Sequence, residues 1–326
     1  MICKNSARVV FGGATIAAIA LVAVTGGGHF ATAADAVGNS QDGATAPGPL
    51  ANHDPDVREA MLNLFSGSAA RHAAQEELVR RCMERHGFTY VKNPSPTEDI
   101  APTLELAPYG LTVDQAEKVG YNAAVNAGDA PGEVDRSGVS KLSPDRQRQW
   151  GEALFGPENA PEVSAKIPGG GVVGTTSKGC LSDAKKKLYG SLSEYAKLTF
   201  LGGNLPLWAK WEAAADTDIA RINASWAACI SGKGFANLKS PDAARKNALS
   251  LHREFGVSSA AARDREISLA VADAECDKAT DYSRQRIKIE DRHFRAALEK
   301  YAAEVADIRK MNASALVRAN EVLGKL

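Results

Sequence analysis

Cysteine is the residue type with the clearest chemical role in this chain. Five cysteines occur, and Cys3 lies in an N-terminal segment that we expect to be removed. The other four are Cys82, Cys180, Cys229 and Cys276, separated by 98, 49 and 47 residues. No Cys-x2-Cys pair occurs, so the spacing does not favour a zinc site. An even number of cysteines in an exported chain predicts two disulfides instead.

Sequence patterns typical of enzymes are weak. Ser182-Asp-Ala-Lys185 matches the Ser-x-x-Lys pattern of penicillin-binding enzymes, but neither Ser-Asp-Asn nor Lys-Thr-Gly accompanies it. No histidine has a partner at metal-ligand spacing, and Glu290 and Asp291 are interpreted as part of a solvated helix face. The sequence therefore predicts no catalytic residue, no metal ligand and no cofactor.

Aromatic side chains are the other candidates for binding. Trp208 and Trp211 suit a sugar site, but they lie on an apolar helical stripe, which favours a place in the core. Tyr109, Tyr121 and Trp150 are candidates for a small-ligand site in the irregular middle of the chain.

The first 33 residues have the three parts of a secretory signal peptide. Lys4 and Arg8 give a positive start, residues 9–24 are uncharged and mostly apolar, and Ala31-Thr32-Ala33 fits the small-x-small cleavage rule. We expect export by the general pathway and cleavage after Ala33. An uncleaved anchor is the alternative, but the apolar stretch is shorter than the roughly 20 residues of a membrane-spanning helix.

The charge balance argues against several classes of partner. The chain has 39 basic and 39 acidic residues, and residues 1–33 hold two of the basic ones and none of the acidic ones. The remaining chain thus carries 37 basic and 39 acidic residues. Such a near-neutral balance argues against nucleic acid, which attracts strongly basic proteins, and against anionic lipid.

Composition divides the exported part into a leader and one helical domain. Residues 34–54 have almost no large apolar side chain and are predicted to be disordered. Residues 55–326 are rich in alanine and poor in aromatic residues, which favours helices, although 92–178 is irregular. We predict a mainly α domain, stapled by disulfides and made of two quasi-repeats, 55–203 and 204–326.

The repeats rest on two segments that share the pattern Cys-x4-Gly-Phe-x3-Lys-x-Pro. They are residues 82–94 and 229–241. A glycine just after a helix adopts the left-handed conformation without penalty, and the next residue folds back onto the last turn. Both segments are therefore predicted to end a helix, with the stop residues Gly87, Phe88, Gly234 and Phe235.

Each of these helix ends is followed by one further cysteine. The duplication therefore favours the pairs Cys82–Cys180 and Cys229–Cys276. The rival pairing, Cys82–Cys229 with Cys180–Cys276, joins equivalent positions of the two repeats and stays open.

Periodicity predicts the helices of the second half. Apolar residues at steps of three and four predict a helix from Cys180 to Phe200, ended by Gly202-Gly203, and another from Pro206 to Cys229. From about residue 260 to 323 neither proline nor glycine occurs, which predicts a single long helix.

The last part of this long helix has a seven-residue apolar repeat from 287 to 322. Such a repeat is typical of coiled coils, so this face is a candidate for contact with a partner or with a second copy of the chain. A break near Asp277–Tyr282 is the alternative to one continuous helix. The interaction face consists of Ile287, Phe294, Leu298, Tyr301, Val305 and Ile308.

The ordered motifs resemble those of a group of actinobacterial exported proteins of unknown function, many of them lipoproteins. The resemblance rests on the Cys-x4-Gly-Phe helix end, the Tyr109–Asn122 segment, Gly179-Cys180-Leu181, Trp226-x2-Cys229 and the C-terminal helix with Cys276. This chain lacks a cysteine after the apolar stretch to which a lipid would be attached. The resemblance implies no activity and no catalytic residue.

These features predict an exported, non-catalytic protein that binds a protein of the cell envelope or extracellular space through the 287–322 face. One alternative is a cell-wall-directed hydrolase with its site in the irregular region 92–178. The other alternative is a small-ligand-binding protein.

Overall fold

The computed structural model describes residues 8–11, 52–95, 109–123, 135–168 and 170–325. This part of the chain is mainly α, as the sequence predicts. Its helices are α1 (Pro55–Leu62), α2 (Ser68–Arg85), α4 (Val113–Val119), η2 (Val139–Lys141, a 3-10 helix), α6 (Pro144–Phe155), α7 (Cys180–Tyr189), α8 (Leu192–Ala214), α9 (Thr217–Gly232), α10 (Pro241–Phe255), α11 (Ala260–Thr280), α12 (Tyr282–Lys300) and α13 (Ala302–Val322).

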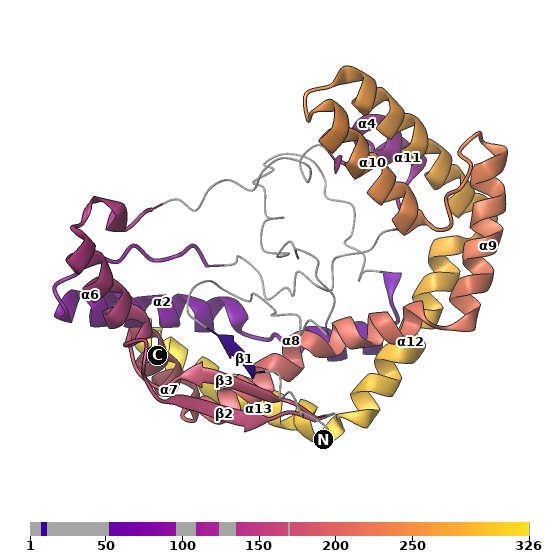
Figure 1. Cartoon of the computed structure of the whole chain (residues 1–326). Coiled ribbons are helices and arrows are strands. Elements are labelled where there is room, and N and C mark those ends of the chain that lie inside the picture. The colour runs from indigo at the N-terminus through magenta and orange to yellow at the C-terminus, as the bar shows by residue number, and fades with distance from the viewer. Residues whose placement is uncertain (1–7, 12–51, 96–108, 124–134, 169, 326) are drawn as a thin grey trace, which may run out of the picture.

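The described helices form an arc (Figure 1). Helices α4, α10 and α11 gather at one end of the arc, and α2, α6 and α7 gather at the other. Helices α8, α9, α12 and α13 run between the two ends, so the C-terminal helices connect both groups.

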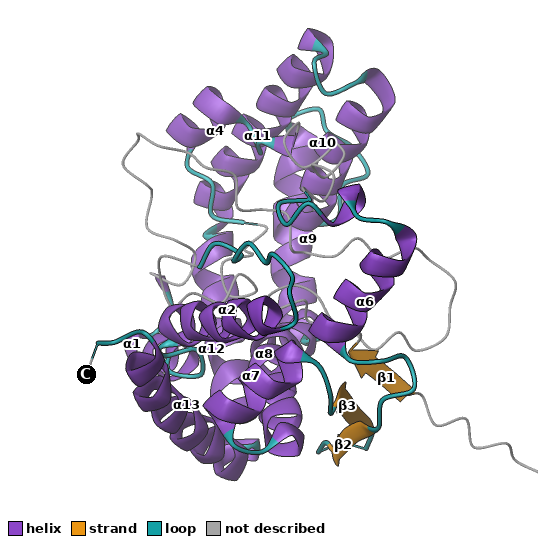
Figure 2. Cartoon of the chain, turned by 90° about the vertical axis from the view of Figure 1, so that its left-hand side faces the viewer, coloured by secondary structure: helices purple, strands orange, loops and turns teal. Residues whose placement is uncertain are grey.

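A small sheet lies beside α7 and α8 (Figure 2). Its strands are β1 (Arg8–Phe11), β2 (Glu162–Lys166) and β3 (Val172–Thr176), in the order β1-β3-β2. Strands β2 and β3 form an antiparallel hairpin, and β1 pairs with β3 in parallel. Strand β1 lies in the predicted signal peptide, and the other residues of that segment lie outside the described part.

Two disulfides connect the helices in the pairing that the repeated Cys-x4-Gly-Phe motif favours. Cys82 is bonded to Cys180 with an S–S distance of 2.02 Å, and Cys229 is bonded to Cys276 at 1.98 Å. The first bond joins the end of α2 to the start of α7, and the second joins α9 to α11. The rival pairing is therefore wrong.

Both Gly-Phe motifs end their helices by the same hydrogen bonds. Gly87 has φ 74° and Gly234 has φ 91°, so both occupy the left-handed region. The next amide in each motif donates back to the last turn, from Phe88 to the Met83 carbonyl at 3.0 Å and from Phe235 to the Ile230 carbonyl at 3.2 Å. This bond satisfies a carbonyl that the helix itself leaves unpaired.

The helices between the two disulfides differ from the sequence prediction. The chain breaks at Gly190, and α8 then passes through Gly202-Gly203 and Pro206 without ending. Packing explains the continuity, because Gly202, Leu201 and Leu205 are buried and Gly202 faces Ile308 of α13. Burial of this face outweighs the weak helix propensity of the two glycines.

The predicted single C-terminal helix is wrong, and the alternative break is observed. Asp281 takes a left-handed conformation with φ 54° and separates α11 from α12. A second interruption, at Tyr301, separates α12 from α13. Both breaks redirect the chain, so the three helices wrap around the other elements rather than extend as one rod (Figure 1).

The heptad face of 287–322, which the sequence predicts to be an interaction face, packs inside the chain instead. Phe294, Val305 and Ile308 are buried in a core that also holds residues of α1 and α8. Leu298 and Tyr301 pack against the same core, and Ile287 is buried in a second core around α9 and α11. The heptad repeat thus arises from packing within the chain.

The predicted disordered leader, 34–54, reaches too far toward the C-terminus. His53 is buried, and its imidazole lies 2.6 Å from Asp291 of α12. The Asp54 amide donates to the same carboxylate at 3.0 Å, and the Asp54 side chain caps α1. The folded domain therefore begins before residue 55, and residues 34–51 lie outside the described part.

Substitution of two glycines by alanine should separate backbone strain from a steric clash. At Gly87, a Cβ would meet no described atom within 4 Å, so Gly87→Ala should cost only the left-handed conformation, about 1–2 kcal/mol. At Gly179, with φ 91°, a Cβ would lie 2.3 Å from the Gly156 nitrogen, so Gly179→Ala should lower stability further. Urea unfolding of both variants measures the difference, and equal losses would contradict the packing of α6 against α7.

Candidate functional site

The largest set of buried ionisable side chains lies where residues 109–123 pack against α11 and α12. Glu266, Asp273 and Asp277 follow one another on α11 at spacings of seven and four residues, which places them on one helix face. Glu290 continues the row on α12. Glu266, Asp273 and Glu290 are buried, and Asp277 is half-buried. We call these four residues the acidic row.

The end of the 109–123 segment is bound by two members of the acidic row. The Tyr121 hydroxyl donates to Asp273 at 2.9 Å, and the indole N–H of Trp226 donates to the other oxygen of Asp273 at 2.8 Å. The Ala123 amide donates to Glu266 at 2.9 Å. Each carboxylate thus accepts hydrogen bonds that compensate for the water it loses on burial.

The start of the segment is bound by the other two members. The Gly110 amide donates to Asp277 at 3.1 Å, and the Tyr109 hydroxyl donates to Glu290 at 2.5 Å. Arg286 donates from Nε to Glu290 at 2.9 Å and thus balances its charge inside the protein. The segment is therefore held at both ends by carboxylates that lie far away in the sequence.

Between these ends lies the short helix α4 (Val113–Val119), which is capped at its start. Thr112 and Gln115 form the capping box of α4 that the sequence predicts. Gly120 ends α4 with φ 59°, and a Cβ there would lie 2.8 Å from a Glu266 oxygen. Glycine at this position is thus required both by the turn and by the close approach of the carboxylate.

Burial raises the pKa of one carboxyl and two tyrosines in this site. Loss of water raises the pKa of Asp273 to about 6, against the lowering effect of its hydrogen bonds from Tyr121 and Trp226. Burial and the neighbouring carboxylates also raise the pKa values of Tyr109 and Tyr121. Both tyrosines therefore remain neutral hydrogen-bond donors at ordinary pH.

A buried histidine lies beside the acidic row. His252 of α10 places Nε2 2.6 Å from Glu266, and both side chains are buried. Within the described residues, the other ring nitrogen, Nδ1, has no hydrogen-bond partner. The pair ties α10 to α11 at the end of the arc where α4 also packs (Figure 1).

A pocket of about 190 Å³ opens beside Tyr121 and Ala123. Arg245 lies with its guanidinium carbon 4.8 Å from the centre of the Tyr121 ring. The Arg245 Nε atom is buried and has no hydrogen-bond partner among the described residues. The pocket is lined by Tyr121, Ala123, Asp242, Arg245, Lys246 and Leu249.

The structure does not bring together the aromatic candidates from the sequence. Tyr109 and Tyr121 belong to the core around α9 and α11, whereas Trp150 packs with Tyr90 and Phe155 against the α2–α7 core. Trp150 is therefore not part of a site with the two tyrosines.

The two tryptophans of the predicted stripe also differ in environment. Trp208 packs between Phe200 and Tyr301, but 49% of Trp211 is exposed. A core position for Trp211 is therefore wrong, because α8 ends at Ala214 and the stripe does not continue straight into α9.

The serine and the lysine of the Ser-x-x-Lys pattern both make structural contacts. Ser182 is buried, and its hydroxyl donates to the Thr176 carbonyl at 2.6 Å, which ties α7 to β3. Lys185 places its ammonium 5.2 Å from the centre of the Tyr195 ring, and burial lowers the pKa of this lysine. The geometry thus gives the serine a structural partner in the sheet.

Sequence reasoning missed the acidic row, and it assigned Glu290 and Asp291 to a solvated face. That assignment is wrong, because 2% of Glu290 and 5% of Asp291 are exposed. Their partners, Tyr109 and His53, are more than 180 residues away in the chain. The available signal was the seven-residue spacing of Glu266 and Asp273 on an otherwise alanine-rich helix face.

Comparisons of the chain with protein-family models, with curated proteins and with solved structures found no match. Among the described residues, no helix is both long and apolar enough to cross a membrane.

Replacement of Asp273 by asparagine should raise stability at neutral pH. The folded state holds the Asp273 proton more tightly than the unfolded chain, so this residue's contribution to stability falls as pH rises from about 4 to about 6. A pKa raised by about two corresponds to about 3 kcal/mol at most. In Asp273→Asn, the amide oxygen can accept from Trp226 and the amide NH2 can donate to the Tyr121 oxygen.

Urea unfolding at pH 4 and pH 8 tests this prediction. The variant should be more stable than the wild type at pH 8 and similar to it at pH 4. Asp264→Asn, at an exposed position of α11, controls for the substitution itself. A variant that is less stable than the wild type at pH 8 would show that the ionised carboxylate stabilises the fold.

Proposed function

We propose that this chain is an exported, non-catalytic protein that binds another protein in the cell envelope or extracellular space. Two disulfides support an extracytoplasmic location, because such bonds persist in oxidising compartments. The predicted signal peptide supports the same location from the sequence.

The non-catalytic part of the proposal rests on the hydrogen bonds that the acidic row accepts. Glu266, Asp273, Asp277 and Glu290 each accept a hydrogen bond from the 109–123 segment. Groups that catalyse proton transfer have to reach a substrate, whereas these carboxylates face donors of their own chain. Their arrangement therefore supports a structural role for these four carboxylates.

The binding surface that we propose is the connection between α10 and α11. Since the heptad face packs inside the chain, a partner has to contact other apolar side chains. Phe255 ends α10 with 50% of its surface exposed, and Val257 follows with 45% exposed. Arg265 lies 5.8 Å from the Phe255 ring centre and leaves the ring accessible. An exposed aromatic residue at a protruding connection suits a partner protein with an apolar pocket.

Photo-crosslinking tests this surface directly. A photoreactive phenylalanine at position 255 should crosslink one discrete protein in the native envelope fraction, and the same residue at Val317 of α13 is the control. Val317 is 54% exposed and lies on a different helix. Equal adducts at both positions, or none at 255, would contradict the proposed surface.

Purified partner then allows an affinity measurement. Phe255→Ser and Val257→Ser should each weaken binding by about 1–2 kcal/mol, as expected for apolar anchors of an interface. Both positions are exposed, so neither substitution should change the thermal unfolding of the chain. Unchanged affinity in both variants would remove this surface from the proposal.

The pocket beside Tyr121 supports a second candidate function, the binding of a small carboxylate. Arg245 offers a guanidinium to a carboxylate, Lys246 adds positive charge, and the Tyr121 ring gives an apolar wall. Pairing of guanidinium with carboxylate is strong because two N–H groups match two oxygens. The unpartnered Nε of Arg245 is the observation that favours this function.

A thermal-shift screen with small carboxylic acids tests the pocket. A binder should raise the unfolding temperature of the wild type and of Arg253→Ala, an exposed arginine of the same helix that does not line the pocket. Arg245→Ala should lose the shift. A shift that persists in Arg245→Ala would place the ligand elsewhere.

A further inference from the structure

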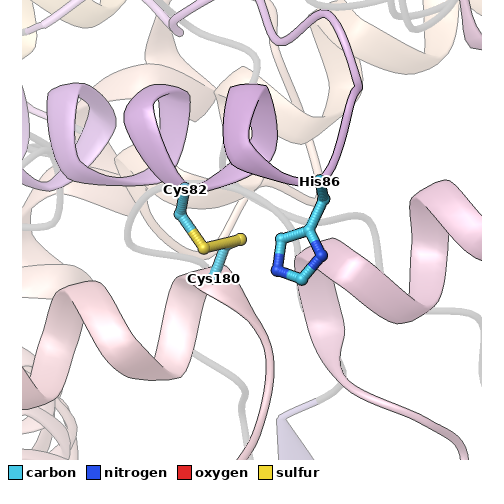
Figure 3. A group of neighbouring side chains, drawn as sticks. All are labelled: Cys82, His86 and Cys180. Carbon is cyan, nitrogen blue, oxygen red and sulfur yellow. A yellow bond between two sulfur atoms is a disulfide. The ribbon is translucent and has the colours of Figure 1, made fainter.

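The environment of the first disulfide differs from that of the second. His86 lies next to the Cys82–Cys180 bond, and its imidazole is directed toward the two sulfur atoms from the end of α2 (Figure 3). Ligand atoms of Cys82, His86 and Cys180 all lie within 4.8 Å of one another. Among the described residues, no comparable third ligand joins Cys229 and Cys276.

The backbone holds these three residues in place independently of the S–S bond. Cys82 and His86 are four residues apart at the end of α2, so they share one helix face. The His86 amide donates to the Cys82 and Met83 carbonyls, which fixes the position of the histidine. Cys180 opens α7 directly after Gly179, whose Cα hydrogen faces the backbone of Gly156 at close range.

Packing also keeps α2 and α7 adjacent. Val79, Met83 and Leu188 belong to one buried core with both cysteines, and Ala319 of α13 closes that core from a third side. Arg318 of α13 donates to the Leu188 carbonyl at 3.0 Å. The two cysteines therefore remain neighbours when the bond between them is opened.

We propose that a dithiol reductant opens the Cys82–Cys180 bond and that the resulting cysteines bind one zinc ion together with His86. In the exchange, the S–S bond of the protein breaks and the reductant's two thiols become a disulfide, so each protein sulfur gains one electron and one proton. Zinc then displaces the two thiol protons and binds both thiolates and one imidazole nitrogen.

The distances fit this set of ligands. In a tetrahedral site with Zn–S bonds of about 2.3 Å and Zn–N bonds of about 2.0 Å, neighbouring ligand atoms lie roughly 3.5–3.8 Å apart. The ligand atoms of the three residues already lie within 4.8 Å of one another, so side-chain rotation can bring them to these values once the bond is open. His86 is exposed, so the fourth position faces solvent and can take water or a ligand of the partner.

Zinc binding by the reduced full-length mature chain tests the proposal. The protein is reduced with a phosphine, given zinc salt alone, passed through a desalting column and analysed for bound metal. Wild type and Arg85→Ala should each hold one zinc ion per chain; Arg85 is the exposed neighbour of His86 and controls for changes at the helix end. The unreduced protein should hold none.

Variants test whether these three residues bind the zinc ion. His86→Ala should weaken zinc affinity by about tenfold or more, because one of three protein ligands is lost. Cys82→Ser/Cys180→Ser retains the other cysteine pair and should bind no zinc. The cobalt(II) form of the wild type should show sulfur-to-metal charge-transfer absorption, which only thiolate ligands produce.

Several outcomes would overturn the proposal. It fails if the reduced wild type holds no zinc, if His86→Ala binds as tightly as the wild type, or if Cys82→Ser/Cys180→Ser still binds the ion. Circular dichroism follows the fold in parallel. Loss of the helical signal on reduction that zinc does not restore would also overturn it, because the site depends on α2 and α7 staying together.

Discussion

Burial of carboxylates on α11 and α12 is the constraint on which the second half of the structure depends. A carboxylate that leaves water needs donors in its place, and here the donors come from Tyr109, Gly110, Tyr121 and Ala123. A short segment is thereby fixed against helices that lie 143 to 181 residues away in the chain. Loss of its donors would leave buried charges without compensation, which is costlier than loss of an ordinary contact.

The disulfides and the C-terminal helices solve a different problem, the assembly of several separate cores. Each disulfide closes a long loop and stabilises by roughly 4–5 kcal/mol in the chain-entropy model. Neither bond connects the core at α2 and α7 to the core around α9 and α11. That connection comes from α12, which packs on α8 and α9, and from α13, which packs on α2, α7 and α8. The apolar heptads of these helices are buried in this role, which is why we propose the exposed turn at Phe255 as the surface for a partner.

The two disulfides are alike in sequence and differ in their surroundings. The first cysteine of each bond lies on a helix that ends in a Gly-Phe pair, but only Cys82 and Cys180 have a histidine beside them among the described residues. The second position of the motif differs as well: Cys180 begins α7, whereas Cys276 lies near the end of α11. The two copies of the motif therefore end a helix in the same way, while the surroundings of the two disulfides differ.

Local sequence determined the features that depend on neighbouring residues. Glycine at positions 87 and 234 ends a helix because only a residue without a side chain takes the left-handed conformation freely. Thr112 and Gln115 cap α4 because the side chain of each accepts a hydrogen bond from the backbone amide of the other. The repeated motif also favoured the pairing of the cysteines that the structure shows, and alanine-rich periodicity predicted the mainly α class.

Only the tertiary structure decided the rest. Helix α8 continues through Gly202-Gly203, the last helix breaks at Asp281, and Glu290 and Asp291 are buried. Each outcome depends on partners that are distant in the chain. A pattern of spacing shows which residues share a face of a helix, but it does not show whether water or protein lies opposite that face.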